Sequence, residues 1–103
     1  MTSVPKQIPD QMTAVEIAEP GGPEVLRPVT ISVPQPGPGE ILVKVEAAGV
    51  NRPDALQRTG GYPPPPGAPT TPGLEIAGTV VDAGPEGTGW AVGDKVCALL
   101  AGG

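Results

Sequence analysis

The sequence contains no histidine and only one cysteine, Cys97. Without histidine, the residues of this chain can form neither a Ser-His-Asp nor a Cys-His catalytic system, and they cannot form a zinc site that uses imidazole. A lone cysteine excludes a disulfide within the chain and is compatible with a reducing cytoplasm. We expect Cys97 to be a small buried residue of a strand.

Basic residues are also scarce, with six lysines and arginines against eleven aspartates and glutamates, for a net charge of −5. The basic residues form no cluster, and a phosphate backbone requires one, so we expect no nucleic-acid partner. No apolar stretch has the length of a bilayer span, and Met1 to Gln11 lacks the apolar core of a signal peptide. The chain is therefore expected to be cytoplasmic and without a membrane partner.

The motifs that hold phosphate groups are missing as well. The nearest candidate, Gly84 to Gly89, reads GPEGTG, which has its glycines in the wrong order for a dinucleotide fingerprint and precedes no helix. There is no P-loop and no GxSxG nucleophile elbow. We therefore expect no Rossmann domain in this chain.

Glycine and proline are abundant, with 16 of each, and they separate short alternating apolar runs. Period-two alternation bounded by such residues predicts strands. The run from Ile41 to Ala47 is the clearest, with Ile41, Val43 and Val45 on one face. The other expected strands are 14–17, 25–33, 74–82 and 95–100. Because Pro28 removes a donor from its strand, that strand should lie at an edge or contain a bulge.

One short helix is expected at Arg52–Arg58, with Pro53 in its first turn. The proline-rich segment 62–69 must be extended. Together these elements predict a small, mostly antiparallel β-barrel or sandwich. At 103 residues the chain has the length of one small domain, which we expect at 12–103, preceded by a flexible tail at 1–11.

Several runs in a fixed order resemble the zinc-free medium-chain dehydrogenase/reductases of the NAD(P)H:quinone oxidoreductase type. They are AAGVNRPDALQR from Ala47, GYPPP from Gly61, PGLEIAGTV from Pro72 and VGDKV from Val92. The resemblance implies a mainly β fold, a GroES-like partly open β-barrel with one short helix. It also implies that the chain is the N-terminal part of an alcohol dehydrogenase-like catalytic domain, truncated before the nucleotide-binding domain.

Two positions carry the argument about metal. Asn51 stands where zinc-dependent members of that superfamily have a cysteine ligand, and Leu74 stands where they have a histidine. A catalytic zinc needs about three protein ligands, so the resemblance implies an enzyme without zinc. It implies hydride transfer from NADPH, held mainly by a domain absent from this chain, to a quinone or another electron-poor acceptor. A homodimer is expected for the full-length protein.

The resemblance also suggests site residues, each with a structural alternative. Asn51 corresponds to an asparagine near the nicotinamide ribose and is the expected cofactor-binding residue, although asparagine also favours helix caps. Tyr62 corresponds to a cleft position and is the expected catalytic residue, whose phenol bonds to the acceptor; the alternative is a ring packed on the proline loop. We expect Asp54 to serve the helix dipole and Glu75 to be a hydrogen-bonded structural carboxylate.

Two other functions fit the same residues. A zinc-free enoyl or alkenal reductase would share the fold and the hydride donor but reduce a polarised C=C bond. A non-enzymatic GroES-like interaction module would use the fold alone, because a fold does not determine a function. The sequence between Met1 and Gly103 does not separate these three functions.

Overall fold

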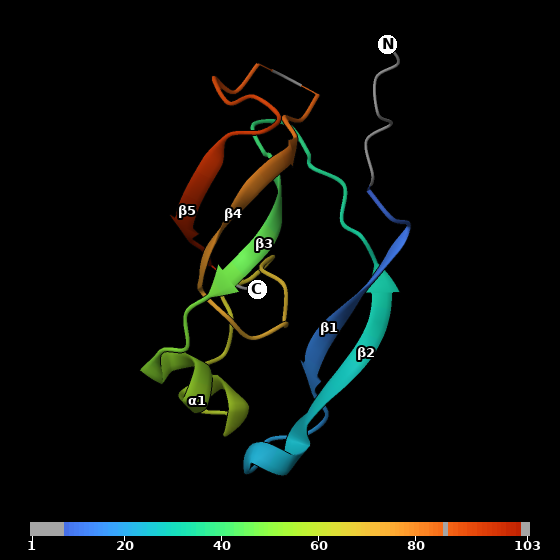
Figure 1. Ribbon diagram of the computed structural model, residues 1–103. Helices are drawn as coiled ribbons and strands as arrows, with labels where there is room; N and C mark the ends of the chain where they lie inside the picture. Colours follow the sequence, from blue (N-terminus) through green and yellow to red (C-terminus); the bar gives the residue numbers. More distant parts are fainter. Residues whose placement is uncertain (1–7, 86, 102–103) are drawn as a thin grey trace.

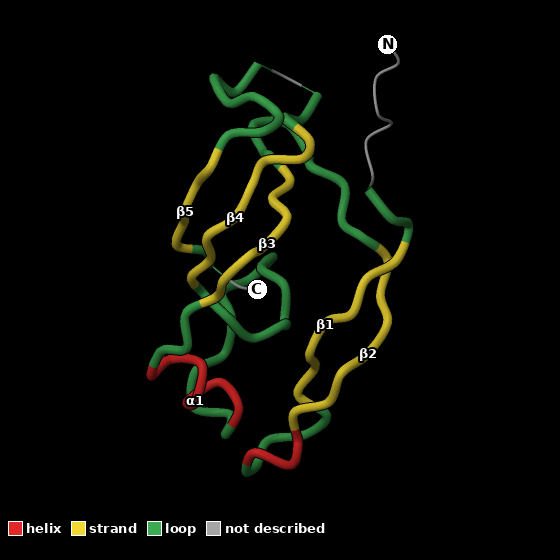
Figure 2. Tube along the Cα trace, in the orientation of Figure 1, coloured by secondary structure: helices red, strands yellow, loops and turns green. Residues whose placement is uncertain are grey.

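The alternating runs form five strands in two separate antiparallel sheets (Figures 1 and 2). The computed structural model describes residues 8–85 and 87–101. The first sheet is a hairpin of two strands, and the second has the order β3-β4-β5. The strands are β1 (Gln11–Ile17), β2 (Leu26–Ser32), β3 (Leu42–Ala48), β4 (Glu75–Asp82) and β5 (Lys95–Leu99). No described helix is both long enough and apolar enough to cross a membrane.

The hairpin pairs β1 with β2 from Gln11 opposite Ser32 to Ile17 opposite Leu26. Both strands of a two-stranded sheet are edges, which is where Pro28 was expected. Pairing starts inside the segment expected to be a tail, because Gln11 belongs to β1 and the N–H of Val33 donates to the Asp10 carbonyl at 3.0 Å. Residues 1–7 of that segment lie outside the described residues.

The turn of the hairpin contains a short 3-10 helix, η1 (Pro23–Val25). The prediction that Val25 belongs to the following strand is therefore wrong. Pro23 fixes its own φ at a helical value, and the N–H of Val25 donates to the Gly22 carbonyl at 3.1 Å, which closes the turn. Val25 is only 7% exposed, so the turn also buries it.

The second sheet contains a bulge in β3. Val45 lies opposite Gly78 and Ala47 lies opposite Ala77, so Glu46 is an extra residue on its strand. A Cβ on Gly78 would collide with the backbone carbonyl of Lys44, which shows how closely the two strands approach there. Glycine in the middle of β4 is therefore required by the neighbouring backbone.

Burial of the predicted apolar face is incomplete. Val45, expected on a buried face, is 49% exposed, and the residue opposite it in β4 is Gly78, which has no side chain. Cys97 was expected to be buried and is exposed, which corrects that prediction. It lies in β5, which pairs only with β4 among the described residues. The buried apolar side chains described are Val25 and Val80, the latter fully buried.

The helix α1 (Arg52–Arg58) has the predicted bounds and lies beside the turn of the hairpin (Figure 1). Two hydrogen bonds of 3.0 Å join it to that turn, from the N–H of Gly21 to the Arg58 carbonyl and from Arg58 Nε to the Gly21 carbonyl. The two sheets do not close on each other. The prediction of a mainly β fold with one short helix and a partly open barrel is confirmed.

Candidate functional site

Asn51 and Glu75 meet at the end of the second sheet that adjoins α1. Asn51 immediately precedes the helix, Glu75 is the first residue of β4, and Asn51 Nδ2 donates to Glu75 Oε1 at 3.0 Å. The N–H of Gly49 also donates to the backbone carbonyl of Glu75 at 3.0 Å. The expectation of a hydrogen-bonded Glu75 is confirmed, and its partner is the residue expected to bind the cofactor.

The absence of a side chain at Gly49 leaves room for this pair. A Cβ built on Gly49 would collide with Glu75 Oε1 and would lie 3.3 Å from Asn51 Nδ2. The carboxylate of Glu75 therefore rests directly over the α-carbon of Gly49. Any side chain at residue 49 would push the carboxylate away from Asn51.

Asp54 holds the backbone of Asn51. The Oδ2 atom of Asp54 accepts a hydrogen bond of 2.9 Å from the Asn51 N–H. Asp54 lies in the first turn of α1, where the positive end of the helix dipole stabilises a carboxylate. The second oxygen, Oδ1, is buried without a hydrogen-bond partner. Asn51 is thus the residue that precedes the helix, as its structural alternative required, and it also reaches Glu75 with its side chain.

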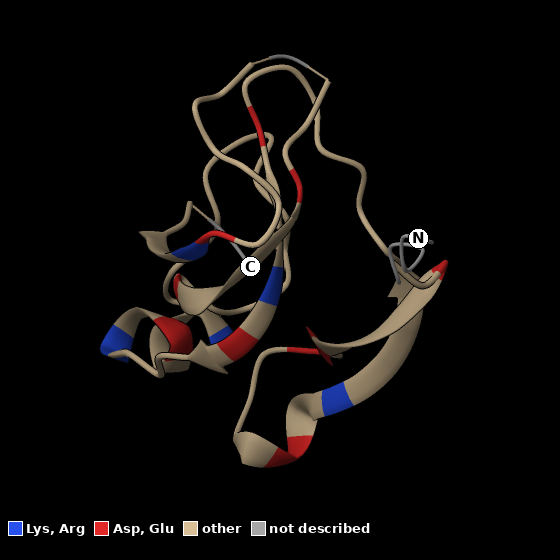
Figure 3. Ribbon diagram, turned by 45° about the horizontal axis from the view of Figure 1, so that its top comes forward, with Lys and Arg blue, Asp and Glu red and all other residues tan. Residues whose placement is uncertain are grey.

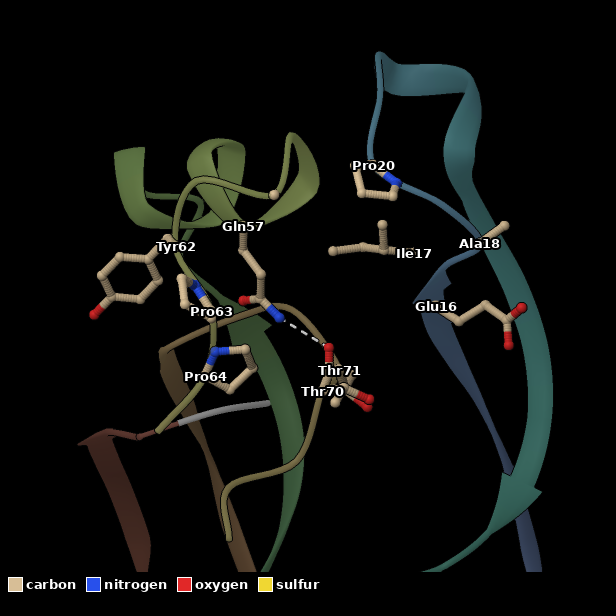
Figure 4. A pocket seen from close by; sticks show the side chains of 11 residues that line it. Glu16, Ile17, Ala18, Pro20, Gln57, Tyr62, Pro63, Pro64, Thr70 and Thr71 are labelled. Carbon is tan, nitrogen blue, oxygen red and sulfur yellow. Dashed lines mark hydrogen bonds between the residues drawn. The ribbon is translucent and has the colours of Figure 1, made fainter. Parts of the chain in front are cut away.

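Tyr62 lies at a different place, on the rim of a pocket of about 420 Å³ between the hairpin and the proline-rich loop (Figure 4). Its ring is on the side far from Ile17 and Pro20, and 39% of the residue is exposed. Gln57 lines the pocket and donates from Nε2 to the Thr70 carbonyl at 2.8 Å. That hydrogen bond ties the loop to α1.

The two expected site residues make no hydrogen bond to each other among the described contacts. Asn51 precedes α1 and Tyr62 follows it, after a turn in which the N–H of Gly61 donates to the Leu56 carbonyl at 2.8 Å. Asn51 does not line the pocket of Tyr62. Gln57 was not predicted as a pocket residue, because nothing in a short helical segment marks which of its polar side chains will reach a loop.

Charged side chains are spread along the ribbon, with Lys and Arg at separate places (Figure 3). One ion pair stands out on the second sheet, where Lys95 Nζ lies 3.3 Å from Glu46 Oε2. Lys95 Nζ also donates to Thr79 Oγ1 at 2.8 Å, and Thr79 Oγ1 donates to Glu46 Oε2 at 3.2 Å. The hydrogen bond from Lys95 and its positive charge lower the pKa of Glu46 below its ordinary value of 4.5, with a smaller contribution from Lys44.

Replacing Lys95 should therefore raise the pKa of Glu46. In Lys95→Met, the carboxyl carbon of Glu46, followed by NMR across the acidic range, should titrate at higher pH than in the parent chain. A folded pKa below the unfolded one adds stability above the unfolded pKa, and this stability is lost as the pH falls through the folded value. Lys44→Met is the matched control and should give a smaller shift. Equal shifts in both variants would mean that general positive charge, and not the Lys95 contact, acts on Glu46.

The described residues contain no group of three histidine, cysteine, aspartate or glutamate side chains placed to hold a metal ion. At the two positions that carried the metal argument, Asn51 donates a hydrogen bond to Glu75, and Leu74 has no ligating atom. The polar groups present are suited to hydrogen bonding.

Comparison with known proteins gives three relevant similarities. The chain is 41% identical to the quinone oxidoreductase of Lama guanicoe over 86 residues. The matched region covers 82% of this chain and 26% of that protein. A mycobacterial protein solved in complex with NADPH is 44% identical, with a TM-score of 0.74 over 86% of this chain and 28% of the other. A cobalt- and zinc-bound alcohol dehydrogenase from Pyrobaculum aerophilum is 41% identical, with a TM-score of 0.74 over 84% and 26%.

The chain thus spans about a quarter of the length of the curated relatives that it matches. Its residues 37–102 match the alcohol dehydrogenase GroES-like domain, a region that begins before β3 and extends beyond β5. That region includes Gly49, Asn51 and Glu75 as well as Tyr62. The predicted GroES-like resemblance is therefore confirmed, and this chain belongs to the alcohol dehydrogenase GroES-like domain family.

Proposed function

We propose that this chain forms the catalytic-domain part of an NADPH-dependent quinone oxidoreductase that works without zinc. NADPH supplies a hydride, and a quinone that takes the hydride and one proton from water becomes a hydroquinone. The support comes from the relatives, one named quinone oxidoreductase and one solved with NADPH. The acceptor, a cytoplasmic location and a homodimer belong to the same proposal and rest on the resemblance.

The observation that carries the proposal is the hydrogen bond of Asn51 with Glu75. Asn51 stands at the position of a zinc ligand in the zinc-dependent relatives. Its amide nitrogen donates a hydrogen bond to the carboxylate of Glu75. Neutral amide oxygens are poor partners for zinc compared with thiolate and imidazole. The same amide suits the sugar or carboxamide end of a nicotinamide cofactor, which offers hydrogen-bonding groups.

Tyr62 is proposed to act on the acceptor. In the part of the chain that the structure describes, its hydroxyl has no hydrogen-bond partner, and the ring borders a pocket. A phenol in that state is free to donate to a quinone oxygen, where negative charge develops as the hydride arrives. The role is that of a donor which stabilises the reduced product as it forms.

The direct test uses a fusion of this chain to the part of the mycobacterial relative that it does not match. The fusion should oxidise NADPH with benzoquinone, followed by the loss of NADPH absorbance. Tyr62→Phe should raise KM for the quinone, or lower kcat, by about fivefold to thirtyfold, as expected for one hydrogen bond. A fusion that binds NADPH, leaves quinones untouched and reduces an alkenal would overturn the proposed acceptor in favour of a polarised C=C bond.

Metal content provides a second, independent test. After dialysis, elemental analysis of the purified chain should find no stoichiometric zinc. The fusion should contain no zinc that depends on residues of this chain. The zinc- and cobalt-bound relative gives the experiment a positive control. One zinc per molecule that is lost in Glu75→Gln would show that Glu75 is a ligand and would end the zinc-free proposal.

A further inference from the structure

We infer that Gln57 is a positioning residue whose side chain holds the proline-rich loop, residues 62–69, and with it Tyr62, in one orientation. The effect of this orientation on an electron acceptor rests on the proposed function. The structural part, that one side chain of α1 holds the loop, stands on the contacts of the described residues alone.

The loop has few main-chain groups with which to hold itself in place. Five of its eight residues are proline, and proline has no backbone N–H to donate. The N–H of Ala68 donates to the Pro65 carbonyl at 3.0 Å, which closes a turn inside the loop. Among the described residues, the segment 62–73 makes a single hydrogen bond to the rest of the chain. In that bond, of 2.8 Å, the Thr70 carbonyl accepts from Gln57 Nε2.

The loop is also stiff, so its orientation is kept or lost as a whole. Each proline fixes its own φ and restricts the residue before it to extended backbone, which includes Tyr62 because Pro63 follows it. Glycines with positive φ stand on either side of the loop, Gly60 at 89° and Gly73 at 116°. Glycine permits backbone rotations that other residues resist. A stiff segment between two such residues turns as one body when nothing else holds it, and Tyr62 turns with it.

The loop is attached to the last turn of α1 at both of its ends. Before the loop, the N–H of Gly61 donates to the Leu56 carbonyl at 2.8 Å, and after it Thr70 accepts from Gln57. Figure 4 shows the Gln57 side chain extending from the helix toward Thr70. A stiff body that is attached at one end can swing, whereas attachment at both ends fixes its orientation. The hydrogen bond of Gln57 is the second attachment.

The hairpin on the other side of the pocket is held differently. Arg58, next to Gln57 in the helix, makes two hydrogen bonds of 3.0 Å with Gly21, one through its main chain and one through its side chain. Loss of the Arg58 side chain leaves the hairpin one of these bonds, whereas loss of the Gln57 side chain leaves Thr70 none. Of the two sides of the pocket, the loop is therefore the one whose position depends on a single side chain.

The holding role is tested on the chain itself by fluorine NMR. Tyr62 is the only tyrosine, so labelling with 3-fluorotyrosine gives one ring signal. Gln57→Met removes the donor and keeps a good helix former, and the signal should narrow and move toward that of a short peptide with the loop sequence. Gln57→Glu, whose ionised carboxylate only accepts hydrogen bonds, should do the same. Gln57→Lys, which still donates, should keep the parent signal.

Arg52→Met is the matched control, because Arg52 begins the same helix and makes none of the hydrogen bonds described for the loop. Its fluorine signal should equal that of the parent chain, and circular dichroism should show that all of the variants keep the fold. An unchanged signal in Gln57→Met would overturn the inference. Equal changes in Gln57→Met and Arg52→Met would overturn it as well.

The consequence for the acceptor is tested in the fusion by steady-state kinetics with NADPH and benzoquinone. Gln57→Met should raise KM for benzoquinone by about threefold to tenfold, as expected for one lost hydrogen bond, and leave KM for NADPH unchanged. Gln57→Lys should return KM for benzoquinone to within about twofold of the parent value. In a Tyr62→Phe background, Gln57→Met should have little further effect, because the loop then positions no hydroxyl.

The same kinetics separate this inference from the proposed function. If the effects of Gln57→Met and Tyr62→Phe on KM multiply, Gln57 does not act through Tyr62 and the inference is wrong. It is also wrong if the fusion reduces benzoquinone with the same KM in Gln57→Met as in the parent. If the fusion reduces no quinone at all, the proposed function fails, while the fluorine signal still decides whether Gln57 holds the loop.

Discussion

The 103-residue chain by itself is expected to bind NADPH no tighter than about 1 mM, at least about a thousandfold more weakly than a micromolar site in the fusion. A dinucleotide needs backbone N–H groups at a helix N-terminus for its pyrophosphate and a charged residue for its ribose end. The glycines between Gly84 and Gly89 do not form that motif. Asn51 and Tyr62 together cannot offset the cost of immobilising a flexible cofactor.

Titration calorimetry of the chain and of the fusion, under one buffer and temperature, makes this comparison directly. The mycobacterial relative solved with NADPH is the positive control. Micromolar binding to the chain alone would show that the GroES-like domain holds the cofactor itself. The proposal that NADPH is held mainly by a domain absent from this chain would then be wrong.

A large loss of stability is expected for Gly78→Ala. The added Cβ would collide with the Lys44 carbonyl and lie 2.9 Å from Val43 Cγ1, so the two strands must separate or the bulge at Glu46 must rearrange. Overpacking of this kind costs roughly 1–3 kcal/mol, and displaced backbone pairing adds to it. Urea denaturation, followed by circular dichroism, should show the lower midpoint with little change in slope.

Gly87→Ala provides the control, because an added Cβ there meets no neighbouring atom. It should change the unfolding free energy by less than about 0.5 kcal/mol. If Gly78→Ala and Gly87→Ala unfold at the same urea concentration, the close approach of β3 and β4 at Gly78 does not exist in solution.

Most of the element positions could be predicted from the sequence, because strands and turns leave local marks. The alternation from Ile41 to Ala47 gave β3 to within one residue, and Pro53 with the following residues gave α1 at its observed bounds. The exposure of Val45 and Cys97 could not be predicted in the same way. Alternation shows that two faces differ, but whether either face is covered depends on packing between sheets that lie far apart in the sequence.

The candidate site was predictable only in its parts. Asn51 stood out by comparison with a zinc ligand and Glu75 as an expected structural carboxylate, yet they lie 24 positions apart and no local pattern links them. Their contact depends on β3 and β4 pairing in a register that brings Ala48 opposite Ile76. Tyr62 depends similarly on how the loop folds back toward Gln57. Pairwise geometry of this kind is a property of the fold and not of any segment.

The separation of the two sheets has a consequence for how the molecule opens. The hairpin of β1 and β2 is built from residues close in sequence, and two hydrogen bonds between Gly21 and Arg58 join its turn to α1. Amide hydrogens of the hairpin should therefore exchange with solvent as one cooperative unit, and those of β4 as another, slower one. Arg58→Ala should accelerate exchange in the hairpin while leaving the protection of Val80 unchanged.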